Sequence, residues 1–461
     1  KANMVSFILP GNSATGGYNV ANSLRFNQPS SDYLNRTPSG AGNQKTFTVS
    51  CWYKRTNFGA NDIIMSTTNG GSSFFSFGFI GSGTYADKFQ FYHYDGTTDY
   101  GYHSAGLYRD TSAWYHIVLA IDTTQGTESN RAKAYINGVQ ETLTATYGAF
   151  PQNLDTYFNN TNIHYIGYNH DSSGALLNGY LSEVVNIDGQ QLDPTSFGEF
   201  DEDSPTIWKP IDVSGLTFGT NGFYLDFENS GSLGADVSGN SNNFTVNNLT
   251  SVDQSTDTCT NNFATMNPLD NFYQGATFSE GNLLIATASS PYTYNTATMG
   301  MSSGKWYWEG KAISVGSGNS AFGIISTVST AVSDEAPNKT DSAMYKDDGV
   351  VRRNNGNGTS IGAVNNNDIV SFAYDADNNF IYFALNGTWQ NSGDPTSGAS
   401  GTGGYDPGNV PASTATGFYF PMFSDHNSGS GFSMSFNFGS PPYAISSGNS
   451  DGNGYGNFEY S

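Results

Sequence analysis

The sequence predicts an all-β protein with two antiparallel β-sandwich (jelly-roll) domains in tandem. Short runs of aromatic or β-branched residues recur along the chain, and stretches rich in Asn, Ser, Thr and Gly separate them. No long segment shows the 3.6-residue apolar period of an amphipathic helix. Aromatic residues make up 15% of the chain, which supplies the burial that a disordered chain lacks.

Turn-rich stretches between groups of strands set the expected domain boundaries. The connector is expected to pack onto the second sandwich, and the initial Lys1 leaves processing of the chain open. The expected parts are an N-terminal segment (1–19), a first sandwich (20–200), a β-rich connector (201–266), a second sandwich (267–445) and a Gly-rich C-terminal tail (446–461).

Charge and cysteine content limit the function classes. The chain has 17 Lys and Arg against 40 Asp and Glu, a formal net charge of −23, so a phosphate backbone would be repelled and nucleic acid is not an expected partner. No apolar run reaches the roughly 18 residues of a membrane span, so no membrane insertion is expected. Cys51 and Cys259 lie in segments assigned to different domains, which predicts two free thiols.

Alternation of apolar and polar residues defines the strands of the first sandwich. In residues 46–54 every second side chain, beginning with Phe47, shares one face. Asn137-Gly138 fits a two-residue type I′ turn, which needs a positive φ at both positions. A helical turn is expected at 192–197. The expected strands are 23–27, 46–54, 113–122, 132–140, 163–169 and 179–187.

Four phrases of the first sandwich, in this order, resemble the concanavalin A-like, LamG-type jelly-roll family. The phrases are FTVSCW (47–52), WYHIV (114–118), YING (135–138) and NGYLSEV (178–184). The resemblance implies two packed antiparallel sheets, used mostly for binding carbohydrate or protein. The family often has Asp where this chain has Ser182, so its calcium site is not carried over to Glu183. We interpret Glu183 as a solvent-facing strand residue and His116 as a hydrogen-bonded core residue.

An acidic stretch at residues 198–205 raises a catalytic alternative. Glycosidases built on this sandwich project an acid and a nucleophile from one face, about 5 Å apart. Glu199, Asp201 and Asp203 alternate in that way. However, the last position is Asp rather than Glu, and the stretch lies between a helical turn and a proline. An exposed acidic linker is therefore the preferred interpretation.

The connector contains two expected strands, 222–227 and 243–246, and a Gly/Asn turn before the second. In this turn Asp236 and Asn240 offer the hard oxygen atoms that Ca²⁺ prefers. No further acidic ligand accompanies them, so a turn stabilised by Asx hydrogen bonds is preferred. No cofactor is expected, and Ca²⁺ at Asp236 and Asn240 stays as the alternative.

Four phrases of the second sandwich resemble the SPRY domain. They are GKWYWE (304–309), NDIV (367–370), LNG (385–387) and FNFG (436–439), and Asn367 departs from the Gly that is usual there. The resemblance implies a bent β-sandwich without catalytic machinery whose loops bind partner proteins. From the residues alone, Trp306 and Trp308 share one face of a strand, which is expected to be core.

Two aromatic residues of the second sandwich are the ligand-binding candidates. Stacking on a sugar needs a solvent-facing ring, and Trp389, just past the Asn386-Gly387 turn, is expected to supply one. Tyr405 lies in the long Gly/Ser/Pro loop 392–417, and loops of that length tend to be functional. This loop and the tail after residue 445 are also candidates for partner contact.

The order of a LamG-type and a SPRY-type domain resembles the virion proteins of tailed phages, particularly marine cyanophages. The resemblance implies a non-catalytic fibre, tail or capsid-decorating protein on the virion surface that binds host surface glycans or proteins. Other virion proteins are then partners, and a homo-oligomer fits a fibre component although no coiled-coil heptads occur. The alternatives are a secreted or cell-surface bacterial adhesin or filament subunit and, third, a glycan-cleaving enzyme.

Overall fold

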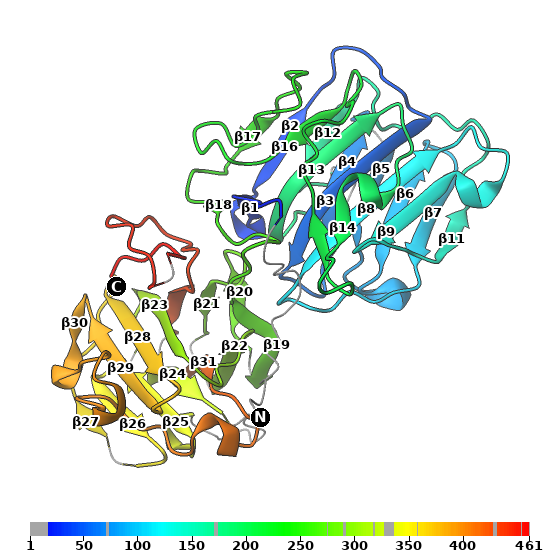
Figure 1. Ribbon diagram of the computed structural model, residues 1–461. Helices are drawn as coiled ribbons and strands as arrows, with labels where there is room; N and C mark the ends of the chain where they lie inside the picture. The colour runs from blue at the N-terminus through cyan, green and yellow to red at the C-terminus, as the bar shows by residue number, and fades with distance from the viewer. Residues whose placement is uncertain are drawn as a thin grey trace. The chain divides into compact units, whose positions relative to one another are not determined.

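The computed structural model confirms the all-β class (Figure 1). Its described residues form strands and short 3-10 turns, and none of them forms an α-helix or a helix able to span a membrane. The chain divides into two compact units, Lys1–Asn262 and Phe263–Ser461. The structure describes residues 17–70, 73–169, 174–273, 275–288, 292–316, 319–326, 336–356, 358–426, 431–452 and 454–460.

The first unit contains two antiparallel sheets that pack face to face (Figure 1). Sheet 1 has the spatial order β10 (Val139–Gln140), β9 (Ala132–Ile136), β8 (Trp114–Asp122), β3 (Thr46–Arg55), β13 (Gly179–Asp188), β1 (Ser23–Phe26) and β18 (Gln254–Ser255), with β16 (Phe223–Leu225) beside β13. Sheet 2 has the order β11 (Leu143–Gly148), β7 (Asp99–Ser104), β6 (Phe89–Tyr94), β5 (Phe74–Phe79), β4 (Asp62–Thr68), β12 (Ile163–Ile166), β2 (Tyr33–Arg36) and β17 (Thr245–Asn247).

The core of the first unit lies between these sheets. Successive side chains of a strand point to opposite faces. Phe75, Phe77 and Phe79 of β5 therefore face the core together, and Phe89 and Phe91 of β6 join them. Burial of each such side chain contributes about 1.5–3 kcal/mol relative to exposure. Aromatic residues at every second position thus hold the two sheets together.

The outer face of sheet 1 is buried as well, under residues 189–262, which we call the covering segment. Its side chains Phe197 and Phe218 pack against Val118 and Ile187 of sheet 1. Short strands of the segment extend both sheets, because β16 pairs with β13, β18 with β1 and β17 with β2. A separate hairpin of β14 (Gly198–Phe200) and β15 (Trp208–Pro210) completes the segment.

This arrangement differs from the expected connector at 201–266, which was to pack onto the second sandwich. The central strands explain the difference. Strands β8 and β13 are buried along their whole length, so the outer face of sheet 1 also needs an apolar cover. Cys51 and Cys259, expected in different domains, both belong to the first unit. Both are buried and unpaired, which confirms the prediction of two free thiols.

The second unit also consists of two antiparallel sheets. Sheet 3 has the order β19 (Met266–Tyr273), β22 (Thr293–Ala297), β31 (Phe420–Asp425), β24 (Ser320–Ile325), β25 (Ser342–Lys346), β26 (Val350–Arg353) and β27 (Thr359–Ser360). Sheet 4 has the order β20 (Thr277–Ser279), β21 (Leu284–Ala286), β32 (Ser433–Asn437), β23 (Lys305–Ser314), β28 (Ile369–Asp375), β29 (Phe380–Leu385) and β30 (Thr388–Trp389).

Aromatic rings fill the core of the second unit, as its sequence predicts. The ring of Trp308 stacks on Phe372 with 5.0 Å between centroids and 4° between planes. Trp306, two residues earlier on β23, is half-buried and packs against the same core. Both tryptophans therefore serve packing, which confirms the interpretation of the KWYWE phrase.

Both Asn-Gly phrases form sharp reversals. The φ angles are 49° and 78° at Asn137 and Gly138, and 48° and 75° at Asn386 and Gly387. A type I′ turn needs these left-handed values, and Asn and Gly adopt them at the lowest cost. The turns join β9 to β10 and β29 to β30.

The C-terminal segment, residues 446–460, folds onto sheet 4. Glu309 of β23 is fully buried, and its carboxylate accepts the backbone N–H groups of Glu459 (3.0 Å) and Tyr460 (2.7 Å). The hydroxyl of Tyr307 donates to the same carboxylate at 2.8 Å. The segment expected as a Gly-rich tail is therefore a packed part of the second unit.

Candidate functional site

The side of sheet 2 that faces away from the core carries partly exposed aromatic rings; we call it the outer face. Because Phe75 and Phe77 of β5 face the core, Phe74 and Ser76 point outward. The same alternation places Tyr92 of β6 outward. The outer face carries aromatic rings because β5 and β6 have aromatic residues in both of their alternating sets.

Four rings gather at one side of the outer face, and we call them cluster 1: Phe74, Tyr92, Tyr94 and Tyr147. The centroid of Phe74 lies 5.2 Å from Tyr92 and 6.2 Å from Tyr94. Tyr147 of β11 stands edge-to-face on Tyr92 at 5.0 Å, and its side chain is 56% exposed. A Cβ on Gly101 of β7 would lie 3.0 Å from the Tyr92 ring. This glycine therefore lets the ring lie close to the sheet.

Three more rings form cluster 2: Tyr33 of β2, Tyr165 of β12 and Tyr168 just after it. Tyr33 stacks on Tyr168 with 5.1 Å between centroids. Tyr165 meets Tyr168 at 5.1 Å and Tyr33 at 5.8 Å, both edge-to-face. Aromatic pairs of this geometry contribute about 0.5–1.5 kcal/mol each beyond their buried area. Tyr165 is 7% exposed, so Tyr33 and Tyr168 are the partly exposed rings of cluster 2.

Strand register places the two clusters in one line across sheet 2. Tyr92 pairs with Ser76 on the next strand. Ser76 pairs with Ser66, and Ser66 pairs with Tyr165. Paired residues of neighbouring strands point to the same face, so two serines separate the clusters. Neighbouring strands are about 4.8 Å apart, which puts the strands of Tyr92 and Tyr165 about 14 Å apart.

The strands of the outer face carry few charged residues, and Lys88, just before β6, lies beside them: burial and the Lys88 charge together lower the pKa of His103 on β7. The eight strands of sheet 2 contain no Lys, and their single Arg, Arg36, shares the inward side with its register partner His164. The same strands contain two carboxylates. Asp62 is fully buried, and Asp99 accepts a hydrogen bond from the Tyr92 hydroxyl. The strands therefore present rings, hydroxyls and amides rather than ions.

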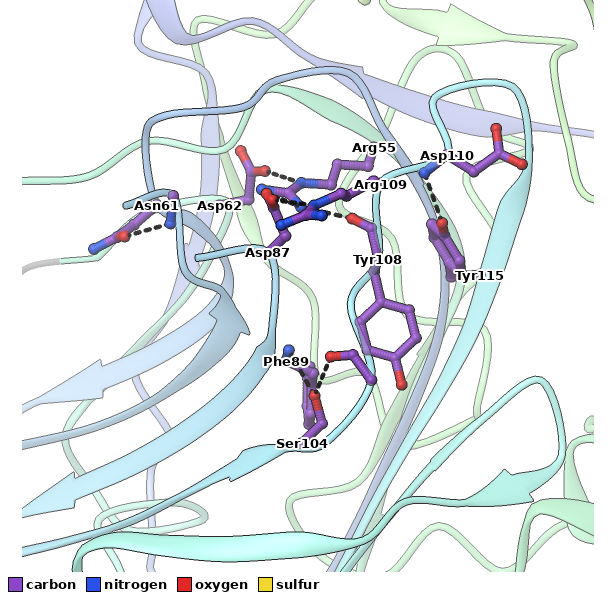
Figure 2. A network of polar contacts seen from close by, with 12 residues as sticks. Arg55, Asn61, Asp62, Asp87, Phe89, Ser104, Tyr108, Arg109, Asp110 and Tyr115 are labelled. Carbon is purple, nitrogen blue, oxygen red and sulfur yellow. Dashed lines mark hydrogen bonds and ion pairs between the residues drawn. The ribbon is translucent and has the colours of Figure 1, made fainter. Parts of the chain in front are cut away.

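A buried ion-pair network anchors one end of the outer face (Figure 2). Arg55, at the end of β3, is fully buried and its Nε donates to Asp62 at 3.1 Å. A second guanidinium nitrogen donates to Asp87 (3.0 Å) and to the carbonyl oxygen of Tyr108 (2.7 Å). Arg109 donates to the other oxygen of Asp87 at 2.7 Å. The network ties together the start of β4, the loop before β6 and the loop after β7.

The network is sensitive to the loss of one partner. Burial raises the pKa of Asp62 to about 7, and the Arg55 guanidinium opposes that rise. Removing either partner would leave a buried unpaired charge, at a cost of about 3–5 kcal/mol. The anchored loop before β6 carries Tyr85, whose ring lies 4.2 Å from that of His103 on β7. The network therefore holds the ring that ends the outer face.

A shallow polar depression of about 590 Å³ opens near the other end of β3. Asp188 lines it and accepts the backbone N–H groups of Asn43 (2.7 Å) and Asn221 (2.8 Å). A Cβ on Gly42 or Gly219 would lie 2.2 Å or 2.0 Å from an Asp188 oxygen, so both glycines are needed there. None of the described residues that line the depression is aromatic. They are residues 41–45, 155, 188, 189, 219 and 220.

The two ligand-binding candidates of the second unit lie on opposite faces of sheet 4. Tyr405 pairs with Ile381 and Trp389 with Ala384, and residues three apart on β29 point to opposite faces. Trp389 is half-buried on the side away from the core. Tyr405 is 4% exposed and packs on Phe383, so the expectation that its ring binds a ligand is wrong. The two residues do not form one site.

The loop 392–417 lies against β29. A Cβ on Gly401 would meet the ring of Phe380 at 2.5 Å, and one on Gly404 would meet the ring of Tyr382 at 2.8 Å. These glycines let the backbone rest directly on two rings, which explains why the loop is rich in Gly.

The candidate calcium ligands form a hydrogen-bonded turn. Asp236 accepts the backbone N–H groups of Tyr224 (2.9 Å) and Asn242 (2.7 Å). The Asn240 amide donates to the carbonyl oxygens of Gly219 and Gly222. This is the Asx-stabilised turn that the sequence favours, and calcium binding there stays a prediction. Among the described residues, no group of three His, Cys, Asp or Glu side chains gathers as a metal site.

The carboxylates weighed as catalytic groups lie on the β14–β15 hairpin. Lys209 Nζ lies 3.4 Å from Glu199 and 3.3 Å from Asp201. Asp201 also accepts the backbone N–H groups of Asp203 and Ser204. The acidic stretch is therefore a folded hairpin rather than the expected linker, and one lysine contacts both leading carboxylates.

Glu183 is 6% exposed, so its interpretation as a solvent-facing strand residue is wrong. A bulge between Ser182 and Val185 interrupts the pairing of β13 with β3, and Glu183 has a φ of 51°. Its carboxylate accepts the hydroxyls of Tyr224 (2.6 Å) and Tyr18 (3.3 Å). Burial raises the pKa of Glu183 to about 7. A bulge cannot be recognised in a regular alternation, which is why the sequence misleads here.

His116 is a hydrogen-bonded core residue, as predicted. Its side chain is 1% exposed, lies 2.8 Å from Ser50 Oγ and accepts the indole N–H of Trp208 at 2.9 Å. Burial lowers the pKa of His116 to about 3.

The rings of the outer face were not among the residues singled out from the sequence. A signal for them exists in the segments FFSFGF (74–79) and FQFYHY (89–94), where both alternating sets contain aromatic residues. Only one set of a strand can enter a given core. The second set must face solvent or another segment.

A family model described as the concanavalin A-like lectin/glucanases superfamily matches residues 28–189. The match agrees with the first resemblance, and the matched stretch contains both aromatic clusters. Among curated proteins, none matches the chain.

Solved structures include distant likenesses. The SPRY domain of human HERC1 aligns with 14% identity and a TM-score of 0.30, over 37% of this chain and 96% of that one. A putative carbohydrate binding protein from Bacteroides ovatus aligns with 19% identity and a TM-score of 0.33, over 50% of this chain and 59% of that one. Domains LG4-5 of the mouse laminin alpha1 chain align with 11% identity and a TM-score of 0.31, over 92% of both chains. TM-scores this low do not assign the chain to the family of any of these proteins.

Proposed function

We propose that the chain is a non-catalytic surface protein of a tailed-phage virion whose outer face of sheet 2 binds glycans on the host surface. The observation that carries glycan binding is the line of outward rings in clusters 1 and 2. The apolar side of a sugar ring stacks on an aromatic ring, and its hydroxyls need nearby hydrogen-bonding groups. The outer face offers both, since Asn35 and Asn247 are hydrogen-bonded to each other beside Tyr33. The match to a lectin/glucanase superfamily supports this choice.

The arrangement of carboxylates supports a binding role over catalysis. A glycosidase needs two carboxyl groups on either side of the scissile bond. Of the two in the strands of sheet 2, Asp62 is buried against Arg55, so among the described strand residues Asp99 is the one carboxylate that faces outward. Glu199 and Asp201 share Lys209 as a partner. The proposal requires no cofactor.

Support for the virion comes from the order of the LamG-type and SPRY-type phrases and from the low content of charged residues, 12%. Other virion proteins and further copies of the chain are the proposed assembly partners. A secreted or cell-surface adhesin of a bacterium would use the same glycan-binding face, so location needs its own measurement. Immunogold labelling of intact particles provides it, and label on bacterial cells alone would contradict the virion role.

Glycan binding is tested by titration of the purified chain on an array of bacterial surface glycans. We expect saturable binding that falls about tenfold in Tyr147→Ala, because an exposed ring at the centre of a contact contributes at least 1–2 kcal/mol. Tyr455→Ala is the matched control, since Tyr455 is also 56% exposed but lies in the second unit. Equal affinity of the two variants, or the absence of any saturable binder, contradicts the proposal. Release of reducing ends from a bound glycan would contradict its non-catalytic part.

A further inference from the structure

We propose that the side chains of Lys54 and Asn262 join in an amide (isopeptide) bond inside the first unit, with Asp257 as the acid–base group. The bond forms within the folded chain and needs no cofactor. This inference is independent of glycan binding. Three features carry it: a buried lysine, its contacts with an amide and a carboxyl group, and the aromatic rings that surround these three side chains.

The nucleophile is a buried lysine. Lys54 lies on β3 and its side chain is fully buried. Side chains two apart on a strand share a face, so Lys54 points with Trp52 to the side that the covering segment occupies. The other cations buried among the described residues, Arg25 and Arg55, stay charged and are not nucleophiles. Burial lowers the pKa of Lys54, which favours the neutral and nucleophilic amine, although the Asp257 carboxylate opposes this change.

Two side chains of the covering segment meet the amine. Lys54 Nζ donates to Asn262 Oδ1 at 2.8 Å and to Asp257 Oδ2 at 2.6 Å. A carbonyl bond is about 1.23 Å long, so the amide carbon of Asn262 is at most about 4 Å from Nζ. That is close to the roughly 3–3.5 Å at which positioned groups react readily. The leaving nitrogen of Asn262 is held as well, because it donates to the carbonyl oxygen of Ser112 at 2.6 Å.

Aromatic rings enclose and orient the acid–base group. The indole N–H of Trp114 donates to the second oxygen of Asp257 at 3.0 Å, which leaves the first oxygen on Lys54. Trp114 and Tyr180 are the register partners of Lys54 on the two neighbouring strands, so all three side chains point to the same face. Both rings are fully buried, and Nζ lies 5.8 Å from the centre of the Tyr180 ring. The rings therefore keep water away from the reacting groups.

The reaction balances without an added reagent. Asp257 takes a proton from the Lys54 ammonium group, which leaves a neutral amine and a neutral acid. The lone pair of Nζ forms a bond to the Asn262 amide carbon, and the bond from that carbon to the amide nitrogen breaks. Asp257 gives its proton to the leaving nitrogen, which departs as ammonia, and takes one further proton from Nζ. Neutral groups thus replace a buried ion pair, which removes the cost of holding two charges away from water.

The bond would fasten the covering segment to the middle of sheet 1. Asn262 is the last residue of the first unit, and β3 lies between β8 and β13 in the sheet. A pull on the chain beyond Asn262 would then reach β3 through a covalent bond, without first peeling the covering segment away. A covalent closure of a long loop also restricts the unfolded chain, as a disulfide does.

Intact mass spectrometry of the denatured full chain tests the proposal, because the bond lowers the mass by that of one ammonia molecule. Proteolysis should then release a fragment that joins the sequence around Lys54 to the sequence around Asn262. Lys54→Arg should keep its full calculated mass. Asn262→Asp should lose water instead and reach the same final mass as the unsubstituted chain, because the product is identical. Asn261→Ala, the control at the neighbouring residue, should still lose ammonia.

The full calculated mass for the folded, unsubstituted chain overturns the inference, and so does a loss of ammonia that persists in Lys54→Arg. A succinimide at an Asn-Gly step also releases ammonia, but it forms without Lys54 and leaves no joined fragment. Circular dichroism shows whether each protein is folded. If Lys54→Arg does not fold, the joined fragment of the unsubstituted chain decides the outcome, and its absence overturns the inference.

Discussion

The Asn-Gly turns of the two units make the same hydrogen bonds. The N–H of His116 donates to Asn137 Oδ1 at 2.8 Å, and the N–H of Asn137 donates back to the His116 carbonyl oxygen at 2.9 Å. In the second unit Asn386 makes the same pair with Ile369, both at 2.9 Å. In each sheet the asparagine side chain thus continues the strand ladder at the point where the backbone turns away.

The cover over the two turns differs. A Cβ on Gly138 would lie 2.3 Å from the Trp208 ring, and one on Gly387 would lie 2.6 Å from the Tyr460 ring. Trp208 is 2% exposed and belongs to the long covering segment, whereas Tyr460 is half-buried near the end of the short C-terminal segment. Stabilisation increases with the apolar area that is buried. The same type of turn can therefore be stabilised by very different amounts, depending on the ring that covers it.

Replacement of the two covering rings should show the largest difference. Trp208→Ala is expected to lower the free energy of unfolding of the first unit by about 3–5 kcal/mol, because it empties a fully buried site. Tyr460→Ala should cost the second unit only about 1 kcal/mol. Urea denaturation followed by hydrogen exchange assigns each loss to its unit. Equal losses would show that the covers do not differ in strength.

Glu183→Gln should change the pH dependence of the first unit. The pKa of Glu183 is raised from 4.5 to about 7 in the fold. The protonated form is therefore favoured by folding, and its contribution is full below the unfolded pKa and is lost as pH rises through the folded one. That loss amounts to about 3 kcal/mol at 1.36 kcal/mol per pKa unit. The variant should lack this decline between about pH 5 and pH 8, measured by urea denaturation. Parallel curves for the two proteins would contradict it.

Glu309→Gln should loosen the C-terminal segment. The substitution replaces one carboxylate oxygen, which accepts hydrogen bonds, with an NH₂ group, which can only donate them. The backbone N–H of Glu459 or Tyr460 therefore loses its acceptor. The expected cost is about 2 kcal/mol, typical of a hydrogen bond to a charged group. Amide exchange at these two residues should accelerate while β28 stays protected. Unchanged exchange would mean that the ring of Tyr460, not the carboxylate, holds the segment.

Gly387→Ala should have the smallest effect, about 1–2 kcal/mol for an alanine in the left-handed region. Asn adopts this conformation more readily, so Gly387→Asn should cost less. If contact with the ring adds to the cost, then Tyr460→Ala combined with Gly387→Ala will cost less than the sum of the two. Thermal unfolding of the four variants distinguishes these cases, and additive costs would show that the backbone alone is strained.

Local patterns in the sequence were sufficient to predict the positions of most strands. The alternation in 46–54 and the Asn-Gly turns depend on neighbouring residues, and the structure has them where predicted. Two strands of the covering segment were also expected, at 222–227 and 243–246, but the strands with which they pair could not be found in this way. Strands β16 and β17 of this segment are three residues long and pair with strands about 40 or more than 200 positions away. Pairing over such distances leaves no local signal.

The sequence predicted the type of candidate site, aromatic rings on a sandwich, but not the residues that form it. Aromatic rings on a sandwich were expected to bind a ligand, but Trp389 and Tyr405 were chosen because they follow a turn or lie in a loop. Burial of Tyr405 depends on its bridge to Ile381, which the loop sequence does not reveal. The line through Tyr92 and Tyr165 depends on the register of four strands, and register is set by the assembled core.

The contact between Trp208 and His116 has a spectroscopic consequence. An indole N–H can only donate, so Nδ1 of His116 carries no proton and the neutral ring keeps its proton on Nε2, beside Ser50. The ring is therefore fixed in one tautomer. If the covering segment lifted away, both tautomers would exchange in water and the pKa would return from about 3 to about 6.5. The ¹⁵N signals of this one imidazole thus report whether the covering segment is docked.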